Sequence, residues 1–206
     1  MFALTLRKSM RKFYAVAILA VSSAFAVFST SAIAANPQVT FETNRGNFVV
    51  ELYPEKAPKT VANFLKYVNS GFYKETTFHR VINHFMIQGG GFNADMSEKQ
   101  TLAPISNEAA NGLKNEIGTI AMARTSDPDS ATAQFFINLE NNVQLNYQGP
   151  DPELIGYCVF GRVLKGMDVV REIGITPTIN VGQYYDVPKS AIVIHQVKLN
   201  TNATNN

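Results

Sequence analysis

The sequence predicts a mainly β domain, either an antiparallel barrel or a sandwich, that also carries two helices. Apolar and polar residues alternate over seven or eight short segments, and two further segments have helical spacing. Strands and helices do not alternate regularly, as they would in a parallel α/β fold. The chain has 206 residues, 46% of them hydrophobic and 17% charged, which is the composition of one globular domain.

The first 34 residues are expected to form a secretory signal peptide that is cleaved after Ala34. Four basic residues at positions 7, 8, 11 and 12 precede an uncharged run over 13–28, and small residues follow up to Ala34. The alternative is an uncleaved membrane anchor, because the apolar run could be extended toward Ile33. Ser22, Ser23 and the small-residue end of the segment favour cleavage.

Removal of this segment changes the charge balance. It contains four of the 18 basic residues and none of the 16 acidic ones, so 14 basic and 16 acidic residues remain, a formal charge of −2. The remaining chain therefore has no strongly basic surface, and nucleic acid is not an expected partner.

The first predicted elements are a β-hairpin and an amphipathic helix. Residues 39–41 and 48–53 alternate around Asn44-Arg45-Gly46, whose residue types suit a tight turn. Prolines at 54 and 58 end the second strand. From Thr60, apolar residues at 61, 64, 65 and 68 follow helical spacing until Gly71.

The later elements are six strands and a second helix. The helix is expected over 167–173, between Gly166 and Gly174. The loops over 93–115 and 139–156 are polar and long enough to form part of a site. The domain is expected to cover residues 35–200, followed by a flexible tail over 201–206. The predicted strands cover residues 77–82, 85–88, 119–123, 134–138, 157–163 and 191–199.

The sequence lacks the usual marks of covalent, metal or phosphate chemistry. It has no G-x-S-x-G motif, and Ser126 and Ser130 suit turns. The run Gly89–Gly91 has no following lysine, so it indicates a sharp turn or the close approach of another chain, such as a peptide ligand. The three histidines lack metal-ligand spacing. Cys158, the single cysteine, lies among apolar residues and is expected to be a buried, inert thiol.

Residues 78–91, FHRVINHFMIQGGG, closely resemble the signature of the cyclophilin-type peptidyl-prolyl isomerases. Further resemblances follow in the family's order and cover nearly all of residues 38–199. The resemblance implies a closed eight-stranded antiparallel β-barrel capped by two α-helices, and it implies no cofactor or metal. The other matching segments are 58–64, 115–124 with GTIAMAR, 133–137 with QFFI, 157–163 and 166–168.

The resemblance also implies a site. Arg80 would be the catalytic residue, stabilising the twisted X-Pro bond by a hydrogen bond and forming no covalent intermediate. From the residues alone, Arg80 could equally form a surface ion pair, and the apolar members could be ordinary core. His79 is expected to be structural and His84 exposed. The implied substrate-binding residues are Phe85, Met86, Gln88, Ala123, Arg124, Gln134, Phe136, Leu145 and Tyr157.

Three positions depart from the pattern common in eukaryotic members. Gln144 stands at a usual tryptophan, so cyclosporin is expected to bind weakly. Tyr157 stands at a usual histidine and keeps a flat ring with a polar tip. Arg124 stands at a usual asparagine, where the expected contact with substrate is through the backbone.

The function that these features imply is prolyl isomerisation in exported proteins, which assists their folding. Because of its leader, the chain resembles the periplasmic cyclophilins of Gram-negative bacteria. The expected partners are proline-containing peptides and unfolded exported proteins, with no stable membrane insertion after cleavage, and we expect a monomer. The alternative is a binding module that holds proline-containing peptides without needing catalysis, which the missing aromatic at Gln144 would favour.

Overall fold

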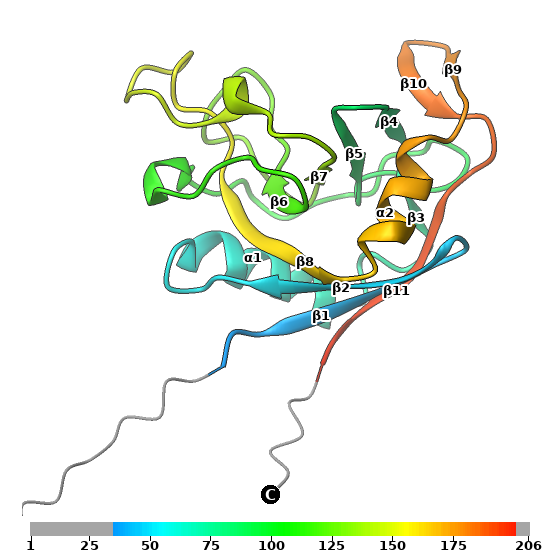
Figure 1. Cartoon of the computed structure of the whole chain (residues 1–206), viewed down its shortest axis with the longest axis horizontal. Helices are drawn as coiled ribbons and strands as arrows, with labels where there is room; N and C mark the ends of the chain where they lie inside the picture. The colour runs from blue at the N-terminus through cyan, green and yellow to red at the C-terminus, as the bar shows by residue number, and fades with distance from the viewer. Residues whose placement is uncertain (1–34, 201–206) are drawn as a thin grey trace, which may run out of the picture. The chain divides into compact units, whose positions relative to one another are not determined.

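The computed structural model describes residues 35–200, so the predicted signal peptide and tail lie outside the described residues. The chain folds around one antiparallel sheet of nine strands, in the order β3-β11-β1-β2-β8-β6-β7-β5-β4 (Figure 1). The strands are β1 (Gln38–Thr43), β2 (Gly46–Leu52), β3 (Thr76–Thr77), β4 (Arg80–Ile82), β5 (Met86–Gly89), β6 (Thr119–Met122), β7 (Phe135–Asn138), β8 (Val159–Lys165) and β11 (Val193–Leu199).

The mainly β fold with two helices is confirmed, but the closed eight-stranded barrel is wrong. The sheet is a curled half-barrel of nine strands, and β3 and β4 at its two ends do not pair with each other. Isolated contacts connect β3 to the residues after β5. Thr77 N–H donates to the Phe92 carbonyl over 2.9 Å, Gly90 N–H donates to the Thr77 carbonyl over 3.3 Å, and an isolated bridge pairs Thr76 with Asn93. Residues after β5 thus approach β3 without forming a strand.

The predicted strand over 77–82 is in fact two strands at opposite ends of the sheet. Thr76–Thr77 pairs with β11, whereas Arg80–Ile82 pairs with β5. The intervening Phe78 and His79 are both buried, so the segment shows the apolar pattern of one strand while its backbone changes partner. The other strands predicted along the sheet are present, with ends shifted by one or two residues.

The core lies inside the curl of the sheet and is rich in aromatic rings. Phe41 and Phe48, opposite each other on β1 and β2, stack with ring centroids 4.6 Å apart. Phe135 meets Phe41, Phe64 and other rings edge-on. It is fully buried, and burial of such a side chain stabilises the fold by about 2–3 kcal/mol.

Helix α1 (Pro58–Asn69) closes one side of this core. Pro58 suits the first turn because its missing N–H would have no partner in the helix, and the helix buries Val61, Phe64 and others. The cap comes from a distant loop. The Glu108 carboxylate accepts hydrogen bonds from the N–H of Lys59, over 3.1 Å, and from that of Thr60, over 2.8 Å. A negative charge here also complements the helix dipole.

Helix α2 (Met167–Gly174) packs on β2, β4 and β5 and is followed by a hairpin that the sequence did not predict. The hairpin consists of β9 (Thr178–Val181) and β10 (Tyr184–Pro188) and forms a separate two-stranded sheet (Figure 1). Most of its side chains are at least partly exposed, so it lacks the alternation by which buried strands are predicted. No helix within residues 35–200 combines the length and apolar character required to cross a membrane.

Candidate active site

The sheet has a second apolar face, outside the curl. Because successive side chains on a strand point to opposite faces, β5, β6, β7 and β8 each send one set of residues into the core and another outward. The outward set forms a separate buried cluster beneath a surface hollow. The cluster consists of Met86, Ala121, Phe136 and Val159, and Ile82, Phe85, Leu113, Ala123, Leu145 and Tyr157 pack against it.

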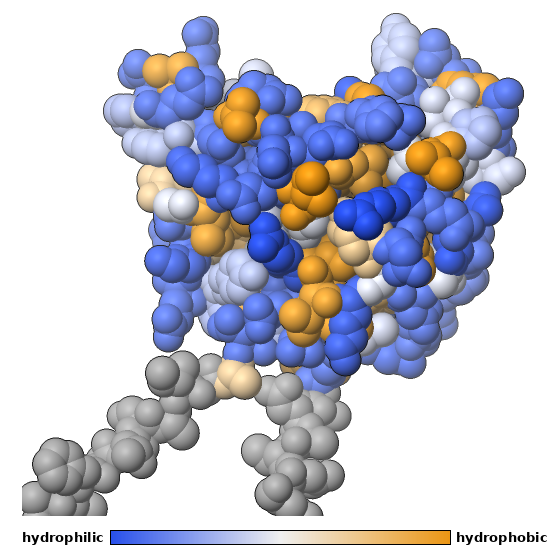
Figure 2. Space-filling model, viewed as in Figure 1, coloured by the Kyte–Doolittle hydropathy of each residue, from blue (hydrophilic) through white to orange (hydrophobic). Residues whose placement is uncertain are grey.

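An open cavity of about 220 Å³ lies over this cluster. It contains nine of the ten residues named from the sequence. Gln134 lines an adjacent cavity of about 240 Å³, which shares Gln88, Ala123 and Arg124 with the first. The upper edge of the molecule dips between the loops at upper left and the β9–β10 hairpin at upper right (Figure 2). The nine residues are Arg80, Phe85, Met86, Gln88, Ala123, Arg124, Phe136, Leu145 and Tyr157.

Arg80 stands on β4, the last strand of the sheet, and its side chain is 43% exposed. It is opposite Gln88 in the β4–β5 register. Its Nε lies 3.7 Å from Oδ2 of Asp186, so the ion pair considered from the sequence is present as well. The guanidinium thus lines an apolar hollow and is accessible to a ligand.

A polar pair and an aromatic pair shape the two walls of the site. Gln88 Nε2 donates to Gln134 Oε1 over 3.0 Å, which joins the two cavities. Phe136 and Tyr157 meet edge-on with centroids 5.6 Å apart, and the Arg124 guanidinium lies 4.6 Å from the Tyr157 centroid. Arg124 Nε also donates to the Gly156 carbonyl over 3.1 Å. Arg124 therefore packs on the Tyr157 ring and helps to hold it in place. The sequence did not indicate this contact.

Buried asparagines hold the wall that carries Leu145. Asn142 donates to Asn138 Oδ1 over 2.7 Å and Asn138 donates to Asn115 Oδ1 over 3.2 Å. Asn115 Nδ2 in turn donates to the Leu145 carbonyl over 2.9 Å. Buried amides that satisfy one another fix a loop more firmly than apolar contact does, because an unpaired member would cost free energy. Sequence reasoning missed these residues, since nothing local marks an asparagine as part of a network.

The three glycines that end and follow β5, Gly89–Gly91, allow close contacts within the chain itself. A Cβ at Gly90 would lie 2.7 Å from Phe135 Cε1, and one at Gly91 would lie 2.5 Å from Gln134 Cγ. Gly90 also has φ of +83°, which disfavours other residues. Within the chain itself, core and site side chains approach this segment closely.

Two titratable groups near the site are buried and have shifted pKa values. His79, next to Arg80, is 7% exposed, and burial lowers its pKa from 6.5 to about 4. Its Nδ1 finds no hydrogen-bond partner within residues 35–200. Burial likewise raises the pKa of the Cys158 thiol to about 11. The histidine is therefore neutral and the thiol protonated near pH 7, as expected for structural residues.

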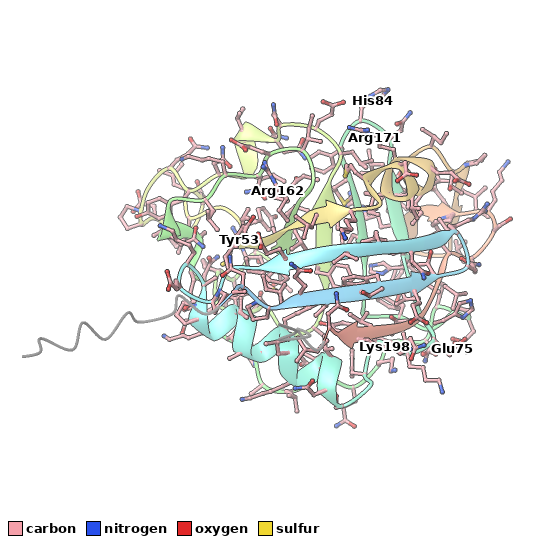
Figure 3. The ribbon with its side chains drawn as sticks, turned by 60° about the horizontal axis from the view of Figure 1, so that its bottom comes forward. Tyr53, Glu75, His84, Arg162, Arg171 and Lys198 are labelled. Carbon is pink, nitrogen blue, oxygen red and sulfur yellow. The ribbon has the colours of Figure 1, made fainter. Side chains whose placement is uncertain are left out.

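A larger hollow of about 460 Å³ lies elsewhere, where Tyr53 on the β2 side faces Arg162 on β8 (Figure 3). Its arginine is already neutralised, because Arg162 Nη2 lies 2.9 Å from Glu116 Oε2. Most of its lining residues are polar or charged, among them Glu55, Lys56 and Lys114. In the part of the chain that the structure describes, no three His, Cys, Asp or Glu side chains gather as a metal site would require.

The residues missed by sequence reasoning come from segments far apart in the chain. Glu98, Thr125, Ser130 and Thr132 line the adjacent cavity, and Asp186 reaches Arg80 from the unpredicted hairpin. No short-range pattern signals such placements.

The protein is a curled antiparallel sheet with an apolar groove on its outer face and a guanidinium at the groove's rim. The nine residues that line the groove include no serine, cysteine or histidine that could act as a nucleophile. The comparisons with known proteins identify the class of the protein. The family described as cyclophilin type peptidyl-prolyl cis-trans isomerase/CLD matches residues 38–199.

Individual relatives agree. Peptidyl-prolyl cis-trans isomerase B of Escherichia coli is 55% identical over 159 residues, which are 77% of this chain and 97% of the relative. Peptidyl-prolyl cis-trans isomerase A of Dickeya dadantii is 49% identical over 183 residues, 89% of this chain and 95% of the relative. A crystal structure of a Cryptosporidium parvum cyclophilin in the presence of the dipeptide Ala-Pro matches with a TM-score of 0.66 and 28% identity, covering 80% of this chain and 99% of that one.

The chain therefore belongs to the cyclophilin-type family and is a peptidyl-prolyl cis-trans isomerase. Its substrates are proline-containing peptides.

Proposed function

We propose that Arg80 is the catalytic residue and that the other residues of the groove bind the proline ring and the adjoining peptide. The observation that carries this proposal is the convergence of nine side chains, one of them a half-exposed guanidinium, on one open cavity of about 220 Å³. Support for the choice of ligand comes from the C. parvum relative, which was crystallised in the presence of Ala-Pro.

The chemistry explains why a charged donor and an apolar pocket suffice. Rotation about an X-Pro bond is slow because the nitrogen lone pair is delocalised into the carbonyl, which gives a barrier of about 20 kcal/mol. When the bond is twisted by ~90°, the lone pair localises on nitrogen and can accept a hydrogen bond, which it cannot do in either planar state. A donor at that point binds the transition state in preference to the substrate.

Arg80 suits this role because its guanidinium stays charged and presents several N–H groups. An acceleration of about ten-thousandfold requires only ~5.5 kcal/mol of preferential stabilisation. The apolar floor formed by Phe85, Met86 and Phe136 holds the ring and disfavours the more polar planar amide. Gln88, Gln134 and the backbone of Ala123 and Arg124 supply polar contacts to the residues before proline.

We also propose that the protein acts on exported proteins in the periplasm and assists their folding. The basic residues, apolar run and small-residue end of residues 1–34 support export. Because only 172 residues follow Ala34, the 183-residue match to the D. dadantii relative extends into this segment. Expression of the full chain in a Gram-negative host tests the proposal: the periplasmic fraction should contain protein that begins at Ala35, and retention of full-length protein in the cytoplasm would refute it.

The catalytic role is tested with a peptide whose reaction is limited by proline isomerisation. Arg80→Ala should lower kcat/KM by about 100- to 1000-fold, the loss typical of one transition-state donor, with an unchanged circular dichroism spectrum. Arg162→Ala is the matched control, because Arg162 is similarly exposed and ion-paired but lies away from the groove. Equal activity of Arg80→Ala and the control would remove Arg80 from its role.

A further inference from the structure

Arg80, the proposed catalytic residue, has one salt-bridge partner within residues 35–200, and this partner comes from the β9–β10 hairpin. Asp186 Oδ2 lies 3.7 Å from Arg80 Nε, with both side chains about two-fifths exposed. Among the described residues, the guanidinium of Arg80 makes no hydrogen bond, so this ion pair is its one polar contact. A long arginine side chain on an edge strand otherwise has many rotamers.

The backbone of the hairpin is shaped to bring this carboxylate to the groove. Strand β10 lies beside β4 without joining its sheet. The β9–β10 register shifts between Tyr184 and Val187, so Asp186 sits in a bulge, and its φ is +59°. Bulges next to sites commonly redirect a side chain, and a left-handed conformation outside glycine costs free energy that the surrounding structure must supply. Asp is one of the few residues that tolerate this conformation.

We propose that Asp186 is a positioning residue for isomerisation. By attracting the Nε edge of the guanidinium, the carboxylate narrows the range of Arg80 rotamers and leaves both Nη groups available as donors to the substrate. In this role Asp186 acts through Arg80 and touches no reacting atom. This inference rests on the proposed catalytic role of Arg80.

The test compares Asp186→Asn and Asp186→Gly with wild type in the peptide assay, with kcat and KM determined separately. Asn removes the charge and keeps the shape, whereas Gly also relieves the backbone. Glu116→Gln is the matched control, because it breaks a shorter ion pair of the same kind, at 2.9 Å, away from the groove. Thermal unfolding of each variant verifies that it is folded.

Both Asp186 variants should lower kcat about three- to fivefold, at most ~1 kcal/mol, with KM changed by less than a factor of two. The control should keep wild-type kcat. Wild-type kcat in Asp186→Asn and Asp186→Gly, or a loss confined to KM, would overturn the positioning role. Arg80→Ala in the same series separates the two proposals. If Arg80→Ala retains activity, the catalytic role of Arg80 is refuted. If Arg80→Ala loses activity and both Asp186 variants keep it, only the role of Asp186 is refuted.

Discussion

Protonation of His79 should destabilise the protein in mild acid. The ring is 7% exposed, packs against Phe92 with centroids 4.5 Å apart, and has a buried Nδ1 with no partner in the described chain. Burial, with a smaller contribution from the neighbouring Arg80, lowers its pKa from 6.5 to about 4. The folded state therefore holds a neutral imidazole at a pH where the unfolded chain has already bound a proton.

The sign and size of the effect follow from this difference. Between pH 6.5 and 4 the unfolded chain binds the extra proton, so the free energy of unfolding falls as the pH falls. Each pKa unit is worth 1.36 kcal/mol, so the full shift corresponds to about 3 kcal/mol. Between pH 7 and pH 4.5, His79 should account for a loss of about 2–3 kcal/mol.

The assay is urea denaturation of wild type and His79→Phe at pH 7 and pH 4.5. Phenylalanine preserves the packing against Phe92 and cannot be protonated. The variant should lose about 2–3 kcal/mol less stability than wild type on acidification. His84→Asn is the control, since that side chain is 81% exposed. Parallel losses in wild type and His79→Phe would refute the assignment.

Two further outcomes are expected. Gly90→Ala should destabilise the protein by about 2–5 kcal/mol, because the backbone there is left-handed and the new Cβ would lie 2.7 Å from Phe135. Gly71→Ala is the comparison, since Gly71 has φ of +69° but open space around it. That variant should lose only about 1–2 kcal/mol in the same denaturation experiment. Equal losses would show that packing at Gly90 is not limiting. Cys158, with its pKa raised to about 11, should react with a thiol reagent at neutral pH only after denaturant is added, and rapid labelling of the native protein would contradict its burial.

Much of the sheet could be predicted from the sequence because its strands bury one or both faces. The short apolar run within 134–138 forms β7, which is buried on both faces: Phe135 and Ile137 enter the core and Phe136 forms the floor of the groove. Alternation does not reveal which strands pair, so the closed barrel came from the resemblance and was wrong. The hairpin over residues 178–188 was missed because few of its side chains are buried.

The residues of the groove were predicted from the family resemblance and not from a pattern within the sequence. The resemblance named ten residues, and nine line one cavity while Gln134 lies beside it. No pattern within the sequence would have gathered Arg80, Arg124 and Tyr157, which lie far apart along the chain. The contacts that support them, such as Asp186 with Arg80 and Asn115 with Leu145, are equally distant and stayed unpredicted.

Because β3 and β4 do not pair, the sheet does not close into a ring. Its two ends are connected by isolated hydrogen bonds within residues 77–92 and by the backbone of Phe78 and His79, which lie between β3 and β4. Arg80 lies on β4, one of the two edge strands of the sheet. The edge strands β3 and β4 each pair with one neighbour, whereas β1, β2 and β11, which carry part of the core, are each paired on both sides.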